Sequence, residues 1–227
     1  MDLAEKLQEE LNCEPVFTIP IFGGIDVKES TVVSWIIIAA LGLLAFLLTR
    51  RLKVHNISKR QAAMEAFVTW MQNLVKGMIG EDGVTFVPYL VTVLLYIGVA
   101  NIIGLFGFKP PTKDLNITAA LAVMSILLVQ YATIRYKGFG KWAKGLVNPI
   151  GILENLTRPL SLCMRLFGNV LGAFVVMKLL EAVVPVGLPA IFSLYFDLFD
   201  GLLQAYVFVF LTALFLQEAV EHEKAKE

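Results

Sequence analysis

The amino-acid sequence predicts an all-α integral membrane protein with five membrane-spanning segments. Of its 227 residues, 57% are hydrophobic and 17% are charged, and the mean hydropathy is +0.73. Residues 31–49, 83–108 and 115–134 contain no charged side chain. Each run is close to or longer than the roughly 20 apolar residues that cross about 30 Å of hydrocarbon. We therefore expect residues 1–227 to form a single membrane domain.

The predicted spans cover about residues 31–49, 84–106, 116–134, 152–180 and 191–217. The last two contain a few charged side chains, unlike the first three. With about 29 residues and a rise of 1.5 Å per residue, the fourth span would be about 43 Å long, which exceeds the hydrocarbon thickness. We therefore expect the fourth and fifth helices to be long, strongly tilted and packed against each other.

A further helix is predicted at about residues 59–79, between the first two spans. Its apolar residues recur at helical spacing: Met64, Phe67, Val68, Met71, Leu74, Val75, Met78 and Ile79. The polar residues Glu65, Gln72, Asn73 and Lys76 fall between them. Two placements fit this pattern: an amphipathic helix along the cytoplasmic membrane interface, or a small cytoplasmic helix packed on the bundle.

The distribution of basic residues predicts the orientation of the chain. Basic residues are concentrated after the first and third spans: Arg50, Arg51, Lys53, Lys59, Arg60, Arg135, Lys137, Lys141 and Lys144. Loops rich in Lys and Arg stay in the cytoplasm. We therefore expect the N-terminus to lie outside and the C-terminus in the cytoplasm.

Several functional classes lack support in this sequence. The formal net charge is zero, so there is no electrostatic argument for nucleic-acid binding. Neither the two histidines, His55 and His222, nor the two cysteines, Cys13 and Cys163, form a metal or redox pattern. There is no glycine-rich phosphate loop and no serine elbow. We expect no metal, no cofactor and no catalytic residue.

A permanent cation lies inside the fourth predicted span. Arg165 keeps its proton wherever the fold places it, and a charge at bilayer depth costs on the order of 2.5–3.5 kcal/mol. Successive residues of an α-helix are rotated by about 100° about its axis, and several polar residues lie within about 40° of Arg165. They form one polar stripe, and its small residues permit close contact with a neighbouring helix. The stripe contains Glu154, Arg158, Ser161, Arg165, Asn169 and Gly172.

The fifth span carries a polar face of its own, formed by Asp197, Asp200 and Gln204 at positions i, i+3 and i+7. Carboxylates in an apolar helix need water or a partner. A single ion pair between Arg165 and one aspartate would not explain why polar residues extend along both helices. Lys178 and Glu181, on the opposite side of the fourth helix, either extend to the interface or pair with each other.

Three segments resemble subunit a of F-type ATP synthases. The run Pro159-Leu160-Ser161-Leu162-Cys163-Met164-Arg165-Leu166-Phe167-Gly168-Asn169 is similar to the family's specific arginine signature. The last span contains the similar run Gln204-Ala205-Tyr206-Val207-Phe208, and Pro111–Thr118 is similar to the start of the family's third span. With the five-span topology, the resemblance covers nearly the whole chain.

The resemblance implies a stator beside a rotating ring of c subunits, each with a carboxylate at mid-depth. Two aqueous half-channels would reach that depth from opposite sides without joining. Arg165 would face the ring, Gln204 would be its partner on the adjacent helix, and Asn116 would lie near one half-channel. The subunit would translocate protons or sodium ions without being an enzyme by itself.

The resemblance also implies the partners of the chain and its cellular location. The partners would be the c-subunit ring, the b subunits of the peripheral stalk, the remainder of the ATP synthase and the lipid bilayer. The location would be the bacterial cell membrane.

An independent ion channel or transporter is disfavoured because the chain has no internal repeat and no second carboxylate-bearing helix complementary to the charged face.

The sequence departs from the family pattern at two positions. Many members have an acidic residue nine positions after the arginine, where this chain has Phe174, and a histidine or acid seven before the glutamine, where it has Asp197. The outer half-channel would then be polar through Asp197 and Asp200, with Lys178 and Glu181 at its mouth. Glu154 would lie near the cytoplasmic half-channel, and Ser161 and Asn169 beside the ion path.

Overall fold

The computed structural model describes residues 15–19, 25–50, 52, 58–106, 108–183 and 187–221. Cys13, both histidines, part of the first basic loop and both chain ends lie outside the described residues.

In the described part of the chain, five helical stretches are long and apolar enough to cross a membrane: Glu29–Thr49, Val84–Phe106, Leu115–Lys137, Gly151–Val183 and Ile191–Val220. The predicted fold class, an all-α integral membrane protein, is therefore confirmed. Among the described residues, β-strands occur in the N-terminal region, where Pro15–Ile19 (β1) and Ile25–Lys28 (β2) form a two-stranded antiparallel hairpin. This hairpin, which the sequence analysis did not predict, leads directly into the first span.

The first three spans are built from regular helices with short flanking turns. They comprise α2 (Glu29–Thr49), η1 (Val84–Phe86), α4 (Val87–Ile102), η2 (Ile103–Phe106), η3 (Pro111–Lys113) and α5 (Leu115–Lys137). Gly138, at a φ of 80°, ends α5 and donates its N–H to the Ile134 carbonyl at 3.1 Å. A residue with a side chain is strained at this φ, so glycine allows the chain to turn here.

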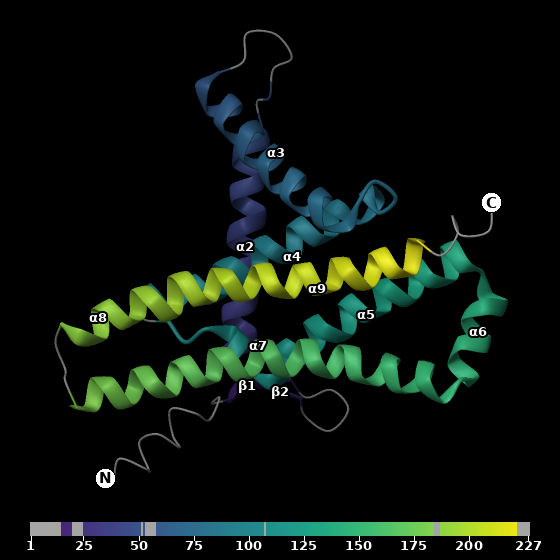
Figure 1. Ribbon diagram of the computed structural model, residues 1–227. Coiled ribbons are helices and arrows are strands. Elements are labelled where there is room, and N and C mark those ends of the chain that lie inside the picture. Colours follow the sequence, from purple (N-terminus) through teal and green to yellow (C-terminus); the bar gives the residue numbers. More distant parts are fainter. Residues whose placement is uncertain are drawn as a thin grey trace.

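The last two spans form a long antiparallel pair. Helix α6 (Phe139–Val147) leads into the 35-residue α7 (Pro149–Val183), which is about 52 Å long at 1.5 Å per residue. The return path consists of α8 (Leu188–Ser193), a π-helix (Leu194–Asp200) and α9 (Gly201–Glu221). Figure 1 shows the two arms running side by side. Their tilt relative to a bilayer stays a prediction.

The apolar core lies where α4 and α5 pack against α9, and α5 also packs against α7. Its fully buried side chains include Leu90, Ile97, Leu162, Leu166 and Phe208. Cys163 is buried in the same core. By contrast, α2 exposes most of its apolar side chains.

Helix α3 (Lys59–Ile79) forms where the sequence predicts a helix. Its N-cap is Ser58, whose hydroxyl accepts the Gln61 N–H at 3.3 Å. The C-terminal half buries Met71, Val75, Met78 and Ile79 against α4 and α9. The preceding turns expose Phe67, Val68 and Trp70. This helix therefore packs on the bundle with its second half, and its placement at a membrane interface stays a prediction.

Asp114 joins three segments near the start of α5. Its carboxylate accepts the Ser30 hydroxyl at 2.6 Å and the Asn116 N–H at 3.0 Å. Lys28 lies 3.9 Å from the same carboxylate, which is 5% exposed. Asp114 is thus both the N-cap of α5 and the buried acceptor that holds the start of α2.

We predict that Asp114→Ala lowers the free energy of unfolding by about 2 kcal/mol, because it removes a helix cap and leaves the Ser30 hydroxyl without its acceptor. Thermal unfolding of the detergent-solubilised chain would show a lower midpoint. Glu81→Ala, at an exposed carboxylate outside the spans, is the control and should leave the midpoint unchanged. Equal midpoints for the two variants would contradict this role of Asp114.

Candidate functional site

Two separate cavities lie against α7 in the described part of the chain. The larger, about 450 Å³, is bordered by the C-terminal half of α7, the end of α4 and the π-helix, and we call it the outer cavity. The smaller, about 200 Å³, is bordered by the N-terminal part of α7, α5, α6 and the end of α9, and we call it the inner cavity. No residue lines both.

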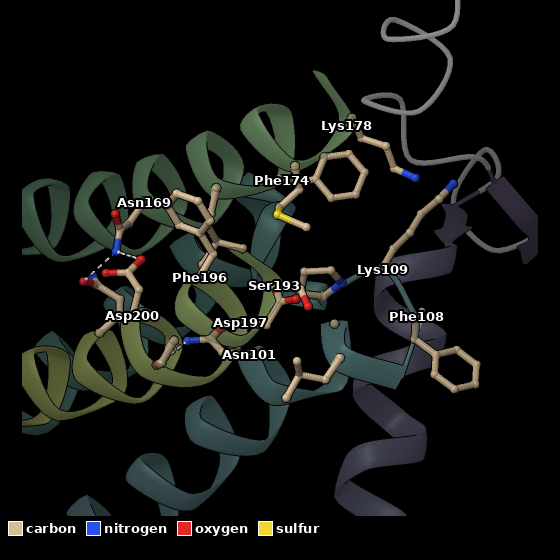
Figure 2. A pocket seen from close by; sticks show the side chains of 18 of the residues that line it. Asn101, Phe108, Lys109, Asn169, Phe174, Lys178, Ser193, Phe196, Asp197 and Asp200 are labelled. Atoms are coloured by element: carbon tan, nitrogen blue, oxygen red, sulfur yellow. Dashed lines mark hydrogen bonds between the residues drawn. The ribbon is translucent and has the colours of Figure 1, made fainter. Parts of the chain in front are cut away.

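The outer cavity gathers most of the side chains that the sequence analysis assigned to ion translocation and to a channel mouth. These are Asn169, Lys178, Glu181, Asp197, Asp200 and Gln204. They come from α7 on one wall and from the π-helix and α9 on the other (Figure 2). Packing α7 against its antiparallel neighbour therefore joins the two polar faces that the sequence predicts separately.

An amide–carboxylate cluster lines the outer cavity at its end nearest to Arg165 along α7. Asn169 Nδ2 donates to Asp200 Oδ2 at 2.8 Å and lies 3.5 Å from Gln204 Oε1 (Figure 2). Gln204 is 4% exposed, and its Nε2 has no hydrogen-bond partner among the described residues. Because a buried donor without an acceptor is costly, this amide is suited to bind water or an oxygen of another molecule.

The two aspartates point toward different walls of this cavity. Asp200 reaches Asn169 on α7, whereas Asp197 packs against the backbone of Gly104, where an added Cβ would lie 2.9 Å from Asp197 Oδ1. The sequence analysis assumed regular α-helical spacing here. The structure has a π-helix instead, whose wider turn separates the two carboxylates.

The region around Lys178 forms the other end of the outer cavity. Lys178 Nζ lies 3.2 Å from Glu181 Oε2, so these residues form the i, i+3 pair that the sequence allowed. Phe174 stands at the position where the family pattern has an acid in many members. Lys113 Nζ lies 4.2 Å and Lys178 Nζ lies 5.8 Å from the centroid of its ring. A cation–π arrangement therefore occupies this position.

The inner cavity is organised around Arg158. Its Nη2 donates to both carboxylate oxygens of Glu218, at 3.0 and 2.8 Å, and to Glu154 Oε2 at 3.2 Å. The guanidinium also lies 5.0 Å from the Phe215 ring centroid. Glu154 therefore lines the inner cavity, and Glu218, which the sequence analysis did not select, pairs with Arg158 across the α7–α9 contact.

A hydrogen-bonded chain of one indole and two amide side chains also lines the inner cavity. Trp142 Nε1 donates to Gln130 Oε1 at 2.7 Å, and Gln130 Nε2 donates to Asn155 Oδ1 at 2.7 Å. These bonds connect α6, α5 and α7. The sequence analysis did not select Gln130, although a glutamine in a charge-free span is a signal that a polar contact is needed.

Arg165 lies on α7 between the two cavities and lines neither. It is exposed and forms no hydrogen bond or ion pair with any residue that the structure describes. At 1.5 Å per residue, it is about 6 Å along the axis from Asn169 and about 10 Å from Arg158. The alternative of a single ion pair between Arg165 and Asp197 or Asp200 is therefore not observed.

Besides Arg165, two further predicted site residues line neither cavity. Ser161 is exposed one turn before Arg165, on the same face of α7. Asn116 is exposed in the first turn of α5, with its N–H bound to Asp114. Their contributions to an ion path stay predictions. Among the described residues, no group of three or more His, Cys, Asp or Glu side chains could hold a metal ion.

Comparison with known proteins identifies the family. The family profile described as ATP synthase A chain matches residues 31–217. "ATP synthase subunit a 2" of Bradyrhizobium sp. (strain BTAi1) is 32% identical over 87% of this chain and 91% of its own length. "ATP synthase subunit a" of Moorella thermoacetica is 34% identical over 87% of this chain and 93% of its own length. The chain belongs to the ATP synthase A chain family and is a multi-pass membrane subunit of the ATP synthase complex.

Proposed function

We propose that the chain is the stator subunit that couples the flow of protons or sodium ions to rotation of a c-subunit ring. The placement of Arg165 carries this proposal. It is an exposed cation between two separate polar cavities, with no counter-charge among the described residues. A guanidinium exposed at bilayer depth requires a carboxylate or water from outside the chain. A rotor carboxylate that passes at this depth supplies that partner.

The mechanism follows from the fixed charge. Arg165 stabilises a deprotonated rotor carboxylate beside it, because an opposite charge nearby favours the ionised form. A protonated carboxylate that arrives from the lipid releases its ion into one cavity. After passing Arg165, it takes up an ion from the other cavity before returning to lipid. The same cation repels ions that would pass directly between the cavities.

The two cavities serve as the half-channels. In the orientation predicted from the basic loops, with the N-terminus outside and the C-terminus cytoplasmic, the outer cavity opens extracytoplasmically and the inner cavity to the cytoplasm. Asp197 and Asp200 hold ions in the first, and Glu154 receives them in the second. Each charge that crosses supplies about 2.3 kcal/mol per 100 mV, so several ions must accumulate per ATP.

The chain performs no covalent chemistry in this proposal. The rotor contacts the exposed face of α7 and α9, and b subunits of the peripheral stalk prevent the stator from turning with it. ATP synthesis takes place elsewhere in the complex. The membrane is the bacterial plasma membrane.

We predict that Arg165→Ala abolishes ion-driven ATP synthesis while leaving assembly largely intact, since removing an intramembrane charge relieves a desolvation cost. Passive ion leak should persist or rise. Arg165→Lys should restore little synthesis, because a lysine at bilayer depth can lose its proton and lacks the planar guanidinium. Synthesis and leak would be measured in vesicles that contain the complex, under an imposed ion gradient.

Arg135→Ala is the control for this experiment. Arg135 is an exposed cation in the last turn of α5 and lines neither cavity, so its removal should leave ATP synthesis unchanged. Normal synthesis by the Arg165→Ala variant would remove Arg165 from the mechanism and with it the rotary proposal.

We predict that cysteines at Asp197 and Asp200 react with a membrane-impermeant thiol reagent added from the extracytoplasmic side, because both residues line the outer cavity. A cysteine at Glu154 should react only from the cytoplasmic side. Phe199→Cys is the control, since Phe199 is exposed in the same π-helix but does not line the cavity. Labelling of neither aspartate position from outside would refute the assignment of the outer cavity.

A further inference from the structure

Asn101 is a buried amide that links the end of α4 to the fifth span. Its Nδ2 donates to the Gly201 carbonyl at 2.9 Å, and its Oδ1 accepts the Thr112 hydroxyl at 2.7 Å. Asn101 is 4% exposed and Thr112 is fully buried. The Thr112 hydroxyl therefore fixes which end of the amide faces Gly201, so that the NH₂ group is available to donate.

The backbones meet closely at this contact. A Cβ on Gly201 would lie 2.8 Å from Asn101 Cβ, which is shorter than a normal carbon–carbon contact. Three residues beyond Asn101, Gly104 packs against the Asp197 carboxylate in the same way. Two glycines thus allow the end of α4 and the following turn to lie directly against the π-helix and the start of α9. Figure 2 shows Asn101 and Asp197 next to each other in this wall.

Gly201 is the residue at which the π-helix becomes α9. Its N–H bonds to the Phe196 carbonyl, an i→i+5 π-helical bond, and also to the Leu198 carbonyl. A π-helix accommodates an additional residue in a wider turn. If residues 194–200 changed to an α-helix, the additional residue of the wider turn would have to fit into regular α-helical turns. The residues N-terminal to Gly201 would then rotate about the helix axis relative to α9, by about 100° for each additional residue.

We propose that Asn101 is a positioning residue of the outer cavity: its amide, oriented by Thr112, anchors Gly201 and so sets the rotation of the π-helix relative to α9. In this rotation Asp200 reaches Asn169 while Asp197 lies against Gly104. The two carboxylates therefore occupy different walls at successive positions along the cavity. The consequence for ion flow rests on the proposed function, but the structural anchoring does not.

Two reporter positions measure this rotation. Ser193 immediately precedes the π-helix and lines the outer cavity, whereas Tyr195 is exposed and does not line it. Ser193→Cys and Tyr195→Cys would be made separately, with Cys13 and Cys163 replaced by alanine. A membrane-impermeant thiol reagent, added from the extracytoplasmic side of membranes that contain the assembled complex, would give the ratio of the two labelling rates.

We expect Asn101→Leu, which keeps the side-chain volume but removes the donor, to lower the ratio of Ser193→Cys to Tyr195→Cys labelling at least about fivefold, the shift that corresponds to one lost buried hydrogen bond. Thr112→Val should lower it in the same direction because the amide loses its orienting donor. Thr112→Ser keeps the hydroxyl and should preserve the ratio.

Thr92→Val is the matched control on α4, because Thr92 is exposed and its hydroxyl bonds only within its own helix. It should leave the ratio unchanged. An unchanged ratio in Asn101→Leu overturns the proposal. If that variant does not assemble, an unchanged ratio in Thr112→Val overturns it.

ATP synthesis provides the functional measurement. If both proposals hold, Thr112→Val lowers ion-driven synthesis in proportion to the fall in the labelling ratio, and Thr112→Ser does not. A changed ratio with normal synthesis retains the anchoring but refutes its role in ion flow. Failure of the rotary function itself would be recognised separately, by normal synthesis in Arg165→Ala.

Discussion

The charge on Arg165 is the constraint around which the rest of this structure is arranged. The guanidinium cannot lose its proton, and the described part of the chain offers it no carboxylate. The other charges of α7 are paired: Arg158 with Glu154 and Glu218, and Lys178 with Glu181. One cation is thus kept available on an exposed helix face, where a partner from outside the chain can neutralise it.

The placement of the cavities follows from how the long helices pack. Polar groups in an apolar bundle require water or one another, and here they collect at the two ends of the α7–α9 pair, on either side of Arg165. Between those ends the contact is filled by apolar side chains such as Leu162, Leu166 and Phe208. The packed middle separates the cavities, which fits the proposed function, in which the two half-channels do not form a continuous pore.

Much of the fold and part of the site could be predicted from sequence patterns. Charge-free runs locate the first three spans because each side chain in lipid must be apolar independently of its neighbours. The helical period places Glu154, Arg158, Arg165 and Asn169 on one face of α7, since residues within one helix have fixed relative directions. The pairs between helices were not predictable in this way. Glu218 is separated from Arg158 by 60 positions, and only the packing of α9 on α7 brings them together.

The sequence by itself therefore determined the number of spans, the polar face of the fourth helix and the family signature around Arg165, all of which are local properties. The tertiary structure decided which residues share a cavity, that Asn116 and Ser161 line neither, and that the fifth span contains a π-helix. A shift from α- to π-helical hydrogen bonding leaves no periodic signal in seven residues. The end of the π-helix meets α4 through the hydrogen bond between Asn101 and Gly201, and a contact between residues 100 positions apart exists only in the folded chain.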